Sequence, residues 1–239
     1  MAKRVVVVIV EGDSDETIVM ELLQERYQGL EIKFDIVRGD IFFNTGLRNM
    51  NIKKEISERI KIYVKKRKYK ESDILSILHI MDTDGCFIPK DSVVLRPNAV
   101  TKIVYDEDEI AAQRPTDQDF ILRRNASKSR NVNIMWSANK VLSDKYKYQL
   151  YFFSRNLEHV VFDDPNPNGD GKCDRIDDFI DDLEMDLATF LMEYMIDCGD
   201  VDYEEAYVES WKNIKHSNNS LKRKTNVPLA IRYLDKLVE

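Results

Sequence analysis

The chain has few cysteines and no long apolar run, and both shortages limit what it can be. Its three cysteines, Cys86, Cys173 and Cys198, are odd in number and far apart, which indicates neither a disulfide framework nor a CxxC zinc site. A reducing compartment suits such a chain, and we expect it in the cytoplasm. No apolar stretch approaches the ~20 residues of a membrane helix, and the run at 5–10 is shorter than the ~7–15 residues of a signal-peptide core. We therefore expect no contact with a membrane.

The chain also lacks an internal repeat, a low-complexity linker and a GxxxxGK(S/T) loop. Any ATPase that works with this protein must therefore be another polypeptide. The chain has 239 residues, of which 43% are hydrophobic and 33% are charged. Such a chain is globular and long enough to bury a core, as one large domain or as a domain with an appendage.

The net charge of −7 is unevenly distributed along the sequence. Residues 53–70 hold nine basic and two acidic residues, whereas residues 163–209 hold seventeen acidic and two basic ones. Residues 210–239 are positive again, with seven basic and two acidic residues. This segregation is expected if one face meets phosphate groups and another meets solvent or a partner.

The N-terminal part of the sequence contains an unbroken β-branched run at 5–10. Such a run is typical of a strand buried on both faces of a parallel sheet. Glu11 and Gly12 follow, and a helical pattern begins at residue 13. A second apolar run, at 74–81, ends in the same way in a D-T-D-G segment. Open α/β sheets bind ligands at the carboxyl ends of their strands, so we expect the carboxylates of both segments to converge. They would repel one another without a cation, and oxygen ligands of this kind suit Mg²⁺ or Mn²⁺.

These two segments resemble the motifs of the Toprim domain, which occurs in topoisomerases, primases, OLD-type nucleases and RloB-like proteins. The matching residues are Glu11, Gly12, Asp15, Asp82, Asp84 and Gly85. Their spacing of about seventy residues fits strand–helix–strand–helix–strand, since a βαβ unit takes roughly 30 residues. The resemblance implies an α/β fold with a Toprim-like (Rossmann-like), mainly parallel sheet and helices on both faces. To this fold we add a helical C-terminal region.

We expect three parts along the chain. Residues 1–110 form the Toprim core, and residues 111–145 form a basic inserted segment that faces the substrate. Residues 146–239 supply a completing strand and the C-terminal helical region of the same domain. Within the inserted segment, Arg123 and Arg124 are the expected nucleic-acid contacts.

A second basic surface is expected on a helix that begins near Ile52. Apolar residues recur there at four-residue spacing, and the opposite face carries the basic cluster. The expected nucleic-acid contacts on it are Lys65, Lys66 and Lys68. A solvated helix face is the simpler alternative and stays open.

Two further site residues rest on the resemblance. The segment 154–158 is similar to a Ser-x-x-x-Glu segment of RloB-like proteins, in which the glutamate opens a helix beside the metal site; Arg155 and Leu157 depart from the small or proline residues usual there. This implies that Glu158 is a metal ligand, the alternative being a helix-start glutamate without a catalytic role. The polar stretch before the last helix also resembles RloB-like chains, and it makes Lys224 a candidate for neutralising phosphate charge.

Other features have plainer explanations. His79 lies inside an apolar run and is expected to be a hydrogen-bonded core residue. The acids at 106–109 suit a helix start, where carboxylates complement the dipole. Residues 164–175 mimic the start of a calcium loop but lack its closing glutamate, so we interpret them as a turn-rich loop. Residues 176–195 are expected to form one acidic helix.

The leading hypothesis is therefore a metal-dependent nuclease that hydrolyses phosphodiester bonds of DNA or RNA. One ion would activate a water molecule while another, roughly 3.5–4 Å away, stabilises the leaving oxygen. The expected ligands are Glu11, Asp15, Asp82, Asp84 and Glu158, and the expected catalytic residues are Glu11, Asp82, Asp84 and Lys224. Resemblance to OLD-type and RloB-like proteins implies a role in phage defence beside a separate ATPase.

Two alternatives belong to other classes. The acidic residues would bind Mg²⁺ structurally in a non-catalytic adaptor for nucleic acid or a partner protein. A phosphatase like the haloacid dehalogenases would also end a strand in DxDG, but its aspartates follow the first strand, which here ends in Glu-Gly. A topoisomerase needs a tyrosine on a separate large domain, for which 239 residues leave no room.

Overall fold

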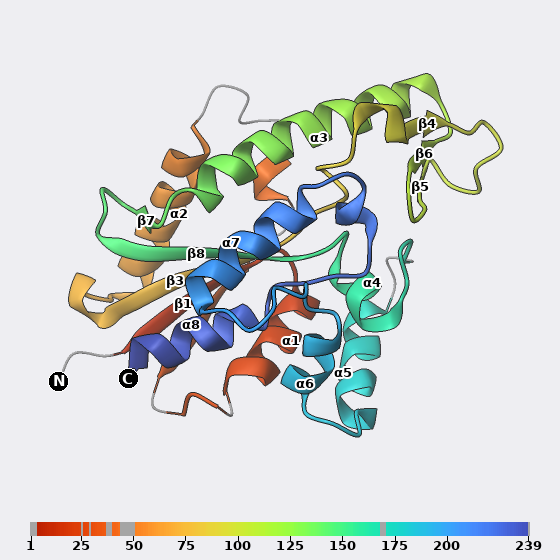
Figure 1. Cartoon of the computed structure of the whole chain (residues 1–239). Helices are drawn as coiled ribbons and strands as arrows, with labels where there is room; N and C mark the ends of the chain where they lie inside the picture. Colours follow the sequence, from red (N-terminus) through yellow and green to blue (C-terminus); the bar gives the residue numbers. More distant parts are fainter. Residues whose placement is uncertain are drawn as a thin grey trace. The chain divides into compact units, whose positions relative to one another are not determined.

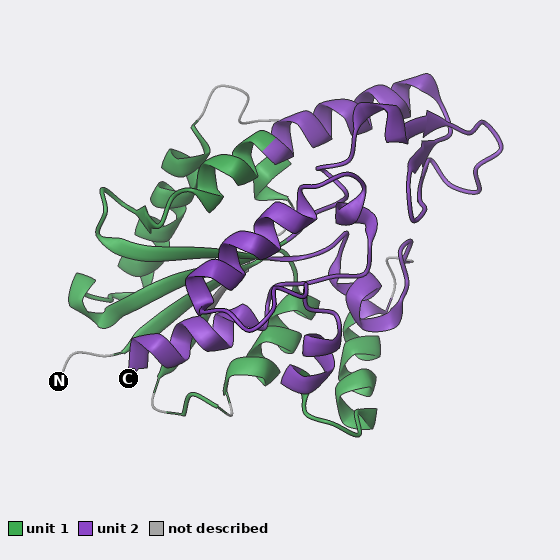
Figure 2. Ribbon diagram, viewed as in Figure 1, with its two compact units in different colours: residues 1–81, 130–151, 173–187 green, residues 82–129, 152–172, 188–239 purple. Residues whose placement is uncertain are grey.

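The structure is a computed structural model that describes residues 4–24, 26–28, 30–36, 40–43, 51–167 and 171–238. The chain divides into two units, each assembled from three separate stretches (Figure 2). Unit 1 comprises residues 1–81, 130–151 and 173–187, and unit 2 comprises residues 82–129, 152–172 and 188–239. The expected parts 1–110, 111–145 and 146–239 do not coincide with these boundaries, because the two units interleave along the chain.

A five-stranded sheet in the order β2-β1-β3-β8-β7 forms the centre of unit 1 (Figure 1). Its strands are β1 (Val5–Val10), β2 (Glu31–Ile36), β3 (Ile74–Asp82), β7 (Lys140–Val141) and β8 (Tyr146–Phe153), the last residues of β3 and β8 belonging to unit 2. Strand β1 is parallel to β2 and to β3, with Ile9 opposite His79, whereas β7 is antiparallel to β8. The structure therefore confirms a mixed α/β fold with a mainly parallel sheet, in which the two predicted apolar strands are neighbours.

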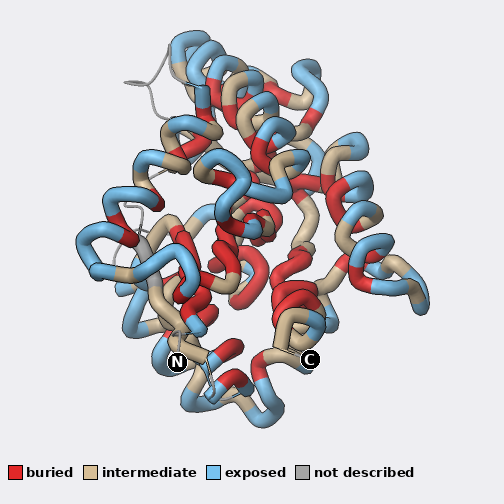
Figure 3. The backbone as a smooth tube through the Cα atoms, turned by 90° about the vertical axis from the view of Figure 1, so that its left-hand side faces the viewer, coloured by how far each residue is buried: buried red, intermediate tan, exposed pale blue. Residues whose placement is uncertain are grey.

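The β-branched composition of β1 explains its central place in the sheet. All six of its residues are buried, because a strand with neighbours on both sides and apolar side chains on both faces has no solvated face. Figure 3 shows the buried residues of the chain in red. The helices of unit 1 are α1 (Asp13–Gln24), α2 (Ile52–Arg67) and α5 (Lys172–Asp182), with 3-10 turns η1 (Ile41–Phe43) and η3 (Glu71–Asp73). Lys172 itself is counted with unit 2.

Helix α2 forms as its sequence predicts. The Asn51 side chain accepts a hydrogen bond from the Lys53 N–H at 2.9 Å, which caps the first turn. The apolar residues at four-residue spacing are buried, as expected: Ile52, Ile56, Ile60 and Val64. The helix ends at Lys68, whose positive φ of 57° breaks the helical backbone.

The prediction for His79 is confirmed as well. The imidazole is fully buried in β3, its Nδ1 lies 2.7 Å from the Tyr148 hydroxyl, and the ring stacks on Phe42 with centroids 5.0 Å apart. His79 is thus a hydrogen-bonded residue of the core of unit 1.

Unit 2 contains a three-stranded sheet in the order β4-β6-β5, which was not predicted from the sequence. Its strands are β4 (Val93–Leu95), β5 (Ile103–Tyr105) and β6 (Ile110–Ala112), with β6 parallel to β4 and antiparallel to β5. The helices that belong wholly or mainly to unit 2 are α3 (Pro115–Trp136), α4 (Leu157–Phe162), α6 (Leu187–Glu193), α7 (Tyr203–Ile214) and α8 (Leu229–Val238), with 3-10 turns η4 (Lys90–Ser92) and η5 (Asn219–Leu221).

The small sheet packs on α3 within unit 2. Val93, Ile110 and Ala112 form an apolar cluster with Ile121 of α3 and Leu221 of η5. The segment expected as inserted helix and loops is thus mostly one helix, α3, and its first part contributes to the core of unit 2.

Two expectations about elements were wrong. Residues 106–109 are not a helix start; they form the turn between β5 and β6, where the Asp106 N–H donates to the Glu109 carbonyl at 3.0 Å. The expected single helix at 176–195 is two helices, α5 and α6, separated by residues 183–186.

In the described part of the chain, no helix combines the length and apolar character that a membrane crossing requires.

Candidate active site around the D-T-D-G segment

Asp15 holds the turn that follows β1. The Gly12 N–H donates to Asp15 Oδ2 at 2.8 Å, and the Glu16 N–H donates to the Gly12 carbonyl at 3.2 Å. These bonds start α1, and its first turn carries carboxylates that complement the helix dipole. Asp15 is buried, so one of its oxygens serves the backbone rather than an ion.

Glu11 and Asp82 stand at the ends of neighbouring parallel strands. Glu11 is the first residue after β1, and Asp82 is the last residue of β3. One carboxylate oxygen of each is buried, Oε1 of Glu11 and Oδ1 of Asp82. Because Glu11 belongs to unit 1 and Asp82 to unit 2, the separation of the two carboxylates stays a prediction.

Backbone hydrogen bonds fix the D-T-D-G segment in unit 2. The N–H groups of Thr83 and Asp84 donate to the carbonyls of Phe153 and Arg155 at 3.0 and 2.9 Å. The Arg155 N–H in turn donates to the buried Thr83 hydroxyl at 2.7 Å. Asp84 adopts a left-handed conformation with φ 49°. The segment is therefore held at several points, which gives the Asp84 carboxylate a defined direction.

That carboxylate meets a buried lysine. Lys128 Nζ of α3 lies 2.5 Å from Asp84 Oδ2, and the Lys128 side chain is fully buried while 28% of the Asp84 side chain is exposed. Burial by itself would raise the pKa of Asp84, but the positive charges of Lys128 and Arg124 outweigh it and lower the pKa below its ordinary value. Asp84 is thus an ionised partner of a lysine.

Arg124 lies one turn before Lys128 on the same helix and also faces inward. It is buried, and its guanidinium donates to the Asp84 carbonyl at 2.7 Å, to the Tyr105 hydroxyl at 2.6 Å and to Asn125 Oδ1 at 3.0 and 3.1 Å. The expectation that Arg124 contacts nucleic acid is therefore corrected, because its donors serve the interior of unit 2. Arg123 is exposed, and its predicted role stays a prediction.

Arg155 has a structural role, which the sequence did not predict. Its side chain is buried, and its Nη atoms donate to the carbonyls of Asp106, Leu221 and Tyr105 at 3.0, 3.2 and 3.4 Å. It makes no ion pair with any residue in the described part of the chain. Burial lowers its pKa to about 10, against the opposing influence of Tyr105 and nearby carboxylates. Arg155 thus ties three loops of unit 2 together.

Glu158 also has a lysine partner. It is the second residue of α4 and is buried, and its Oε1 lies 2.7 Å from Lys172 Nζ. A metal ion at Glu158 would have to compete with this ammonium. The pair suits a structural role better than the ligand role that the resemblance implies.

Lys224 is the one member of three consecutive basic residues whose ammonium has no partner among the described residues. Lys222 pairs with two carboxylates of the β5–β6 turn, at 2.9 and 3.4 Å. Arg223 donates to two carbonyls of α4 and lies 3.9 Å from the centre of the Tyr194 ring. The Lys224 carbonyl accepts from the Ser154 N–H at 2.8 Å, which places Lys224 beside the end of β8. Lys224 as a residue is half-buried.

The other sequence predictions concern the surface. Lys65, Lys66 and Lys68 are exposed, as nucleic-acid contacts and a solvated face both require. The calcium-like loop lies partly outside the described residues, since 168–170 are not described. In its described part, the Asn166 side chain accepts from the Tyr105 N–H at 2.8 Å and donates to the Tyr105 carbonyl at 2.9 Å, so it extends the edge of β5.

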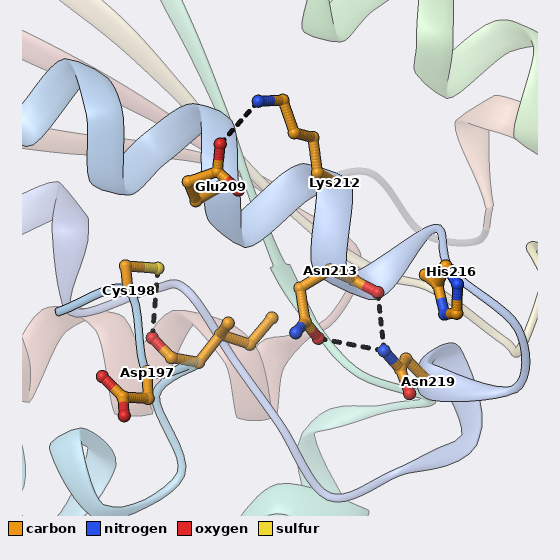
Figure 4. A pocket seen from close by; sticks show the side chains of 8 residues that line it. Asp197, Cys198, Glu209, Lys212, Asn213, His216 and Asn219 are labelled. Atoms are coloured by element: carbon orange, nitrogen blue, oxygen red, sulfur yellow. Dashed lines mark hydrogen bonds and ion pairs between the residues drawn. The ribbon is translucent and has the colours of Figure 1, made fainter.

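A separate pocket of about 420 Å³ lies in unit 2 (Figure 4). Its polar groups bind one another: the Asn219 amide donates to Asn213, and Lys212 pairs with Glu209 at 2.5 Å. Burial and nearby carboxylates raise the pKa of Cys198, whose thiol donates to a backbone carbonyl at 3.3 Å. A thiol held in this way is a poor nucleophile. The Cys198 thiol therefore gives this pocket no activated nucleophile.

Within the described ranges, no group of three or more His, Cys, Asp or Glu side chains is arranged to hold a metal ion. A Mg²⁺ ion usually takes one or two carboxylates from a protein, and Glu11 and Asp82, which belong to different units, stay the predicted ones. Asp84 and Glu158 each pair with a lysine, so a metal ion bound to either carboxylate would have to compete with an ammonium group.

Comparisons with known proteins add no relative: no family model, no curated protein and no solved structure matches this chain.

Proposed function

We propose that this protein is a Toprim-like nuclease that uses Mg²⁺ or Mn²⁺ to hydrolyse phosphodiester bonds of DNA or RNA. The supporting observation is the parallel pairing of β1 and β3. Glu11 directly follows β1, and Asp82 is the last residue of β3. Neighbouring parallel strands present their carboxyl ends at one edge of a sheet, which is where open α/β folds bind ligands. The motif order and this strand order together favour a catalytic carboxylate set.

Glu11 and Asp82 are the residues proposed to hold the ion. When bound, such an ion lowers the pKa of a water molecule and stabilises charge on the phosphate. Lys224 is proposed to bind a phosphate oxygen, because its ammonium has no partner among the described residues. Asp15 is proposed to keep the turn after β1 in place through the Gly12 N–H.

The same proposal extends to the setting of the reaction. We propose a cytoplasmic effector of phage defence that acts with a separate ATPase, as the resemblance to OLD-type and RloB-like proteins implies. The chain carries no GxxxxGK(S/T) loop, so the nucleotide chemistry would belong to the partner.

A non-catalytic adaptor is the second candidate function. Lysines already pair with Asp84 and Glu158, and Asp15 accepts from the Gly12 N–H, so three of the five expected ligands serve the fold. An adaptor would still bind nucleic acid or a partner, with Mg²⁺ in a structural role only.

The Asp82→Asn variant tests the proposal. It keeps the size of the side chain but removes the charge that holds a divalent ion, so cleavage of labelled DNA and RNA should fall at least 100-fold, and Glu11→Gln should behave alike. Asp106→Asn is the matched control and should cleave like wild type, since Asp106 forms a surface pair with Arg96.

The assay compares Mg²⁺, Mn²⁺ and EDTA, and melting temperatures are recorded beside it. Relief of carboxylate repulsion should leave metal-free Asp82→Asn no less stable than wild type. Full cleavage by Asp82→Asn would remove this residue from the mechanism. A wild type that binds Mg²⁺ but cleaves neither nucleic acid would favour the adaptor.

A further inference from the structure

Contacts within unit 2 hold Asp84 in place without a metal ion. Asp84 and Gly85 both have left-handed backbones, with φ 49° and 64°. Arg155 and Arg124 bind the Asp84 backbone from its two ends, at its N–H and at its carbonyl. The backbone of Asp84 is therefore held on both sides, and its carboxylate lies beside Lys128.

The Lys128 side chain is held in place as well. Its side chain is fully buried on α3, and its Nζ lies 2.5 Å from Asp84 Oδ2. An ammonium removed from water needs a nearby negative charge, since the loss of hydration is otherwise uncompensated. Arg124, on the previous turn of α3, adds a second positive charge beside the same residue. A divalent ion bound to Asp84 would lie against two cations that cannot move into solvent.

We infer that Lys128 is the resident cation of the D-T-D-G segment, and that Asp84 binds this lysine in place of a metal ion. The inference rests on the proposed function, in which carboxylates of this segment serve an ion-dependent reaction. It corrects the sequence-based expectation in one respect: any divalent ion is held without Asp84. Lys128 has no exposed surface, so it acts as a positioning residue that supplies fixed positive charge beside the site.

Two matched variants separate the roles of the aspartates. Without metal, Asp84→Asn should lower the melting temperature by roughly 5–10 °C, because it removes a carboxylate that pairs with a buried ammonium. Asp82→Asn, two residues away, should not lower it. The double variant Asp84→Asn/Lys128→Met should regain most of the loss, since it removes both charges. An Asp84→Asn protein that melts like wild type would overturn the inference.

Manganese binding, followed by the paramagnetic resonance of free Mn²⁺, gives a readout that a merely structural pair would not move. Wild type and Asp84→Asn should bind the same number of ions with affinities within twofold, whereas Lys128→Met should gain an ion or bind at least tenfold more tightly. Asp84→Asn/Lys128→Met should lose that gain. A tenfold weakening in Asp84→Asn alone would show that Asp84 is a ligand and would refute the inference.

The two proposals fail in different ways. Absence of cleavage in wild type refutes the nuclease but leaves the melting and manganese comparisons of Asp84 and Lys128 unchanged. If wild type binds no Mn²⁺, the gain in Lys128→Met still decides the inference. If Lys128→Met does not fold, the melting temperatures of Asp84→Asn, Asp82→Asn and the double variant decide it.

Discussion

Gly85 shows how tightly unit 2 packs around the end of β3. Its φ of 64° lies in the left-handed region, and a Cβ added there would lie 2.6 Å from Leu221 Cδ2 and 3.1 Å from Ile110 Cδ1. Both neighbours belong to the apolar cluster under the small sheet. The glycine of the D-T-D-G segment is thus required by packing, whether or not an ion binds nearby.

We expect Gly85→Ala to destabilise the protein by roughly 2–4 kcal/mol, from backbone strain and from overlap with the core. Gly199→Ala is the matched control, because Gly199 has a similar φ of 73° but no atom within 4 Å of the added Cβ. It should cost only the strain, roughly 1–2 kcal/mol. Urea unfolding measures both, and equal losses would contradict the packing argument.

His159 makes stability depend on pH. Burial, and then the charge of Arg155, lowers its pKa to about 4, while Asp163 and the Ser154 carbonyl act in the opposite direction. The unfolded chain binds the proton more readily, with a pKa near 6.5. Folding stability is therefore fully present above about pH 6.5 and is lost as the pH falls from there toward about 4.

The test replaces the imidazole with a side chain that does not titrate. Melting temperatures of wild type should fall between pH 6.5 and pH 4 more steeply than those of His159→Gln. The two proteins are compared at pH 8 to separate the loss of packing from the loss of protonation. Parallel curves over the acidic range would assign the acid sensitivity to other groups.

The sequence predicted the positions of the candidate carboxylates better than their partners. Glu11 and Asp82 are positioned by β1 and β3, and the apolar runs of these strands can be recognised in the local sequence. The lysine that binds Asp84 is 44 residues away, and its pairing depends on how α3 packs in unit 2. The sequence alone does not distinguish a buried basic side chain from a solvated one. For this reason Arg124 was expected at the surface.

Among the elements, α2 carries the clearest surface prediction. If its basic face guides nucleic acid, exchanging Lys65, Lys66 and Lys68 for glutamate should weaken binding at least tenfold and flatten its dependence on salt, because fewer counterions are released. A fluorescence-anisotropy titration at several salt concentrations measures both effects. Unchanged affinity at low salt would show that these lysines form a solvated helix face, which is the alternative to a nucleic-acid contact.

The burial pattern of α3 explains why the sequence predicted this helix only in part. Its inward face includes polar and charged residues beside apolar ones, namely Ile121, Arg124, Asn125, Lys128, Val132 and Met135. A buried face of this kind weakens the hydrophobic periodicity on which a sequence-based helix assignment depends. The expected acidic helix at 176–195 failed for another reason, since its apolar spacing continues across the break between α5 and α6.

At the scale of the whole molecule, the main sheet was predictable and the small one was not. The strands of the main sheet include long apolar runs, whereas β4, β5 and β6 have three residues each. Such short strands carry little periodicity, and they form because β4 and β5 both pair with β6 and pack on α3.

The interleaving of the two units has a consequence for how the protein is made. The chain passes from one unit to the other five times, after residues 81, 129, 151, 172 and 187. A nascent chain emerging from the ribosome therefore cannot finish unit 1 until residue 187 is available, by which time most of unit 2 has also been synthesised. Domains usually fold in order during translation, but here neither unit is complete before more than half of the other has been synthesised.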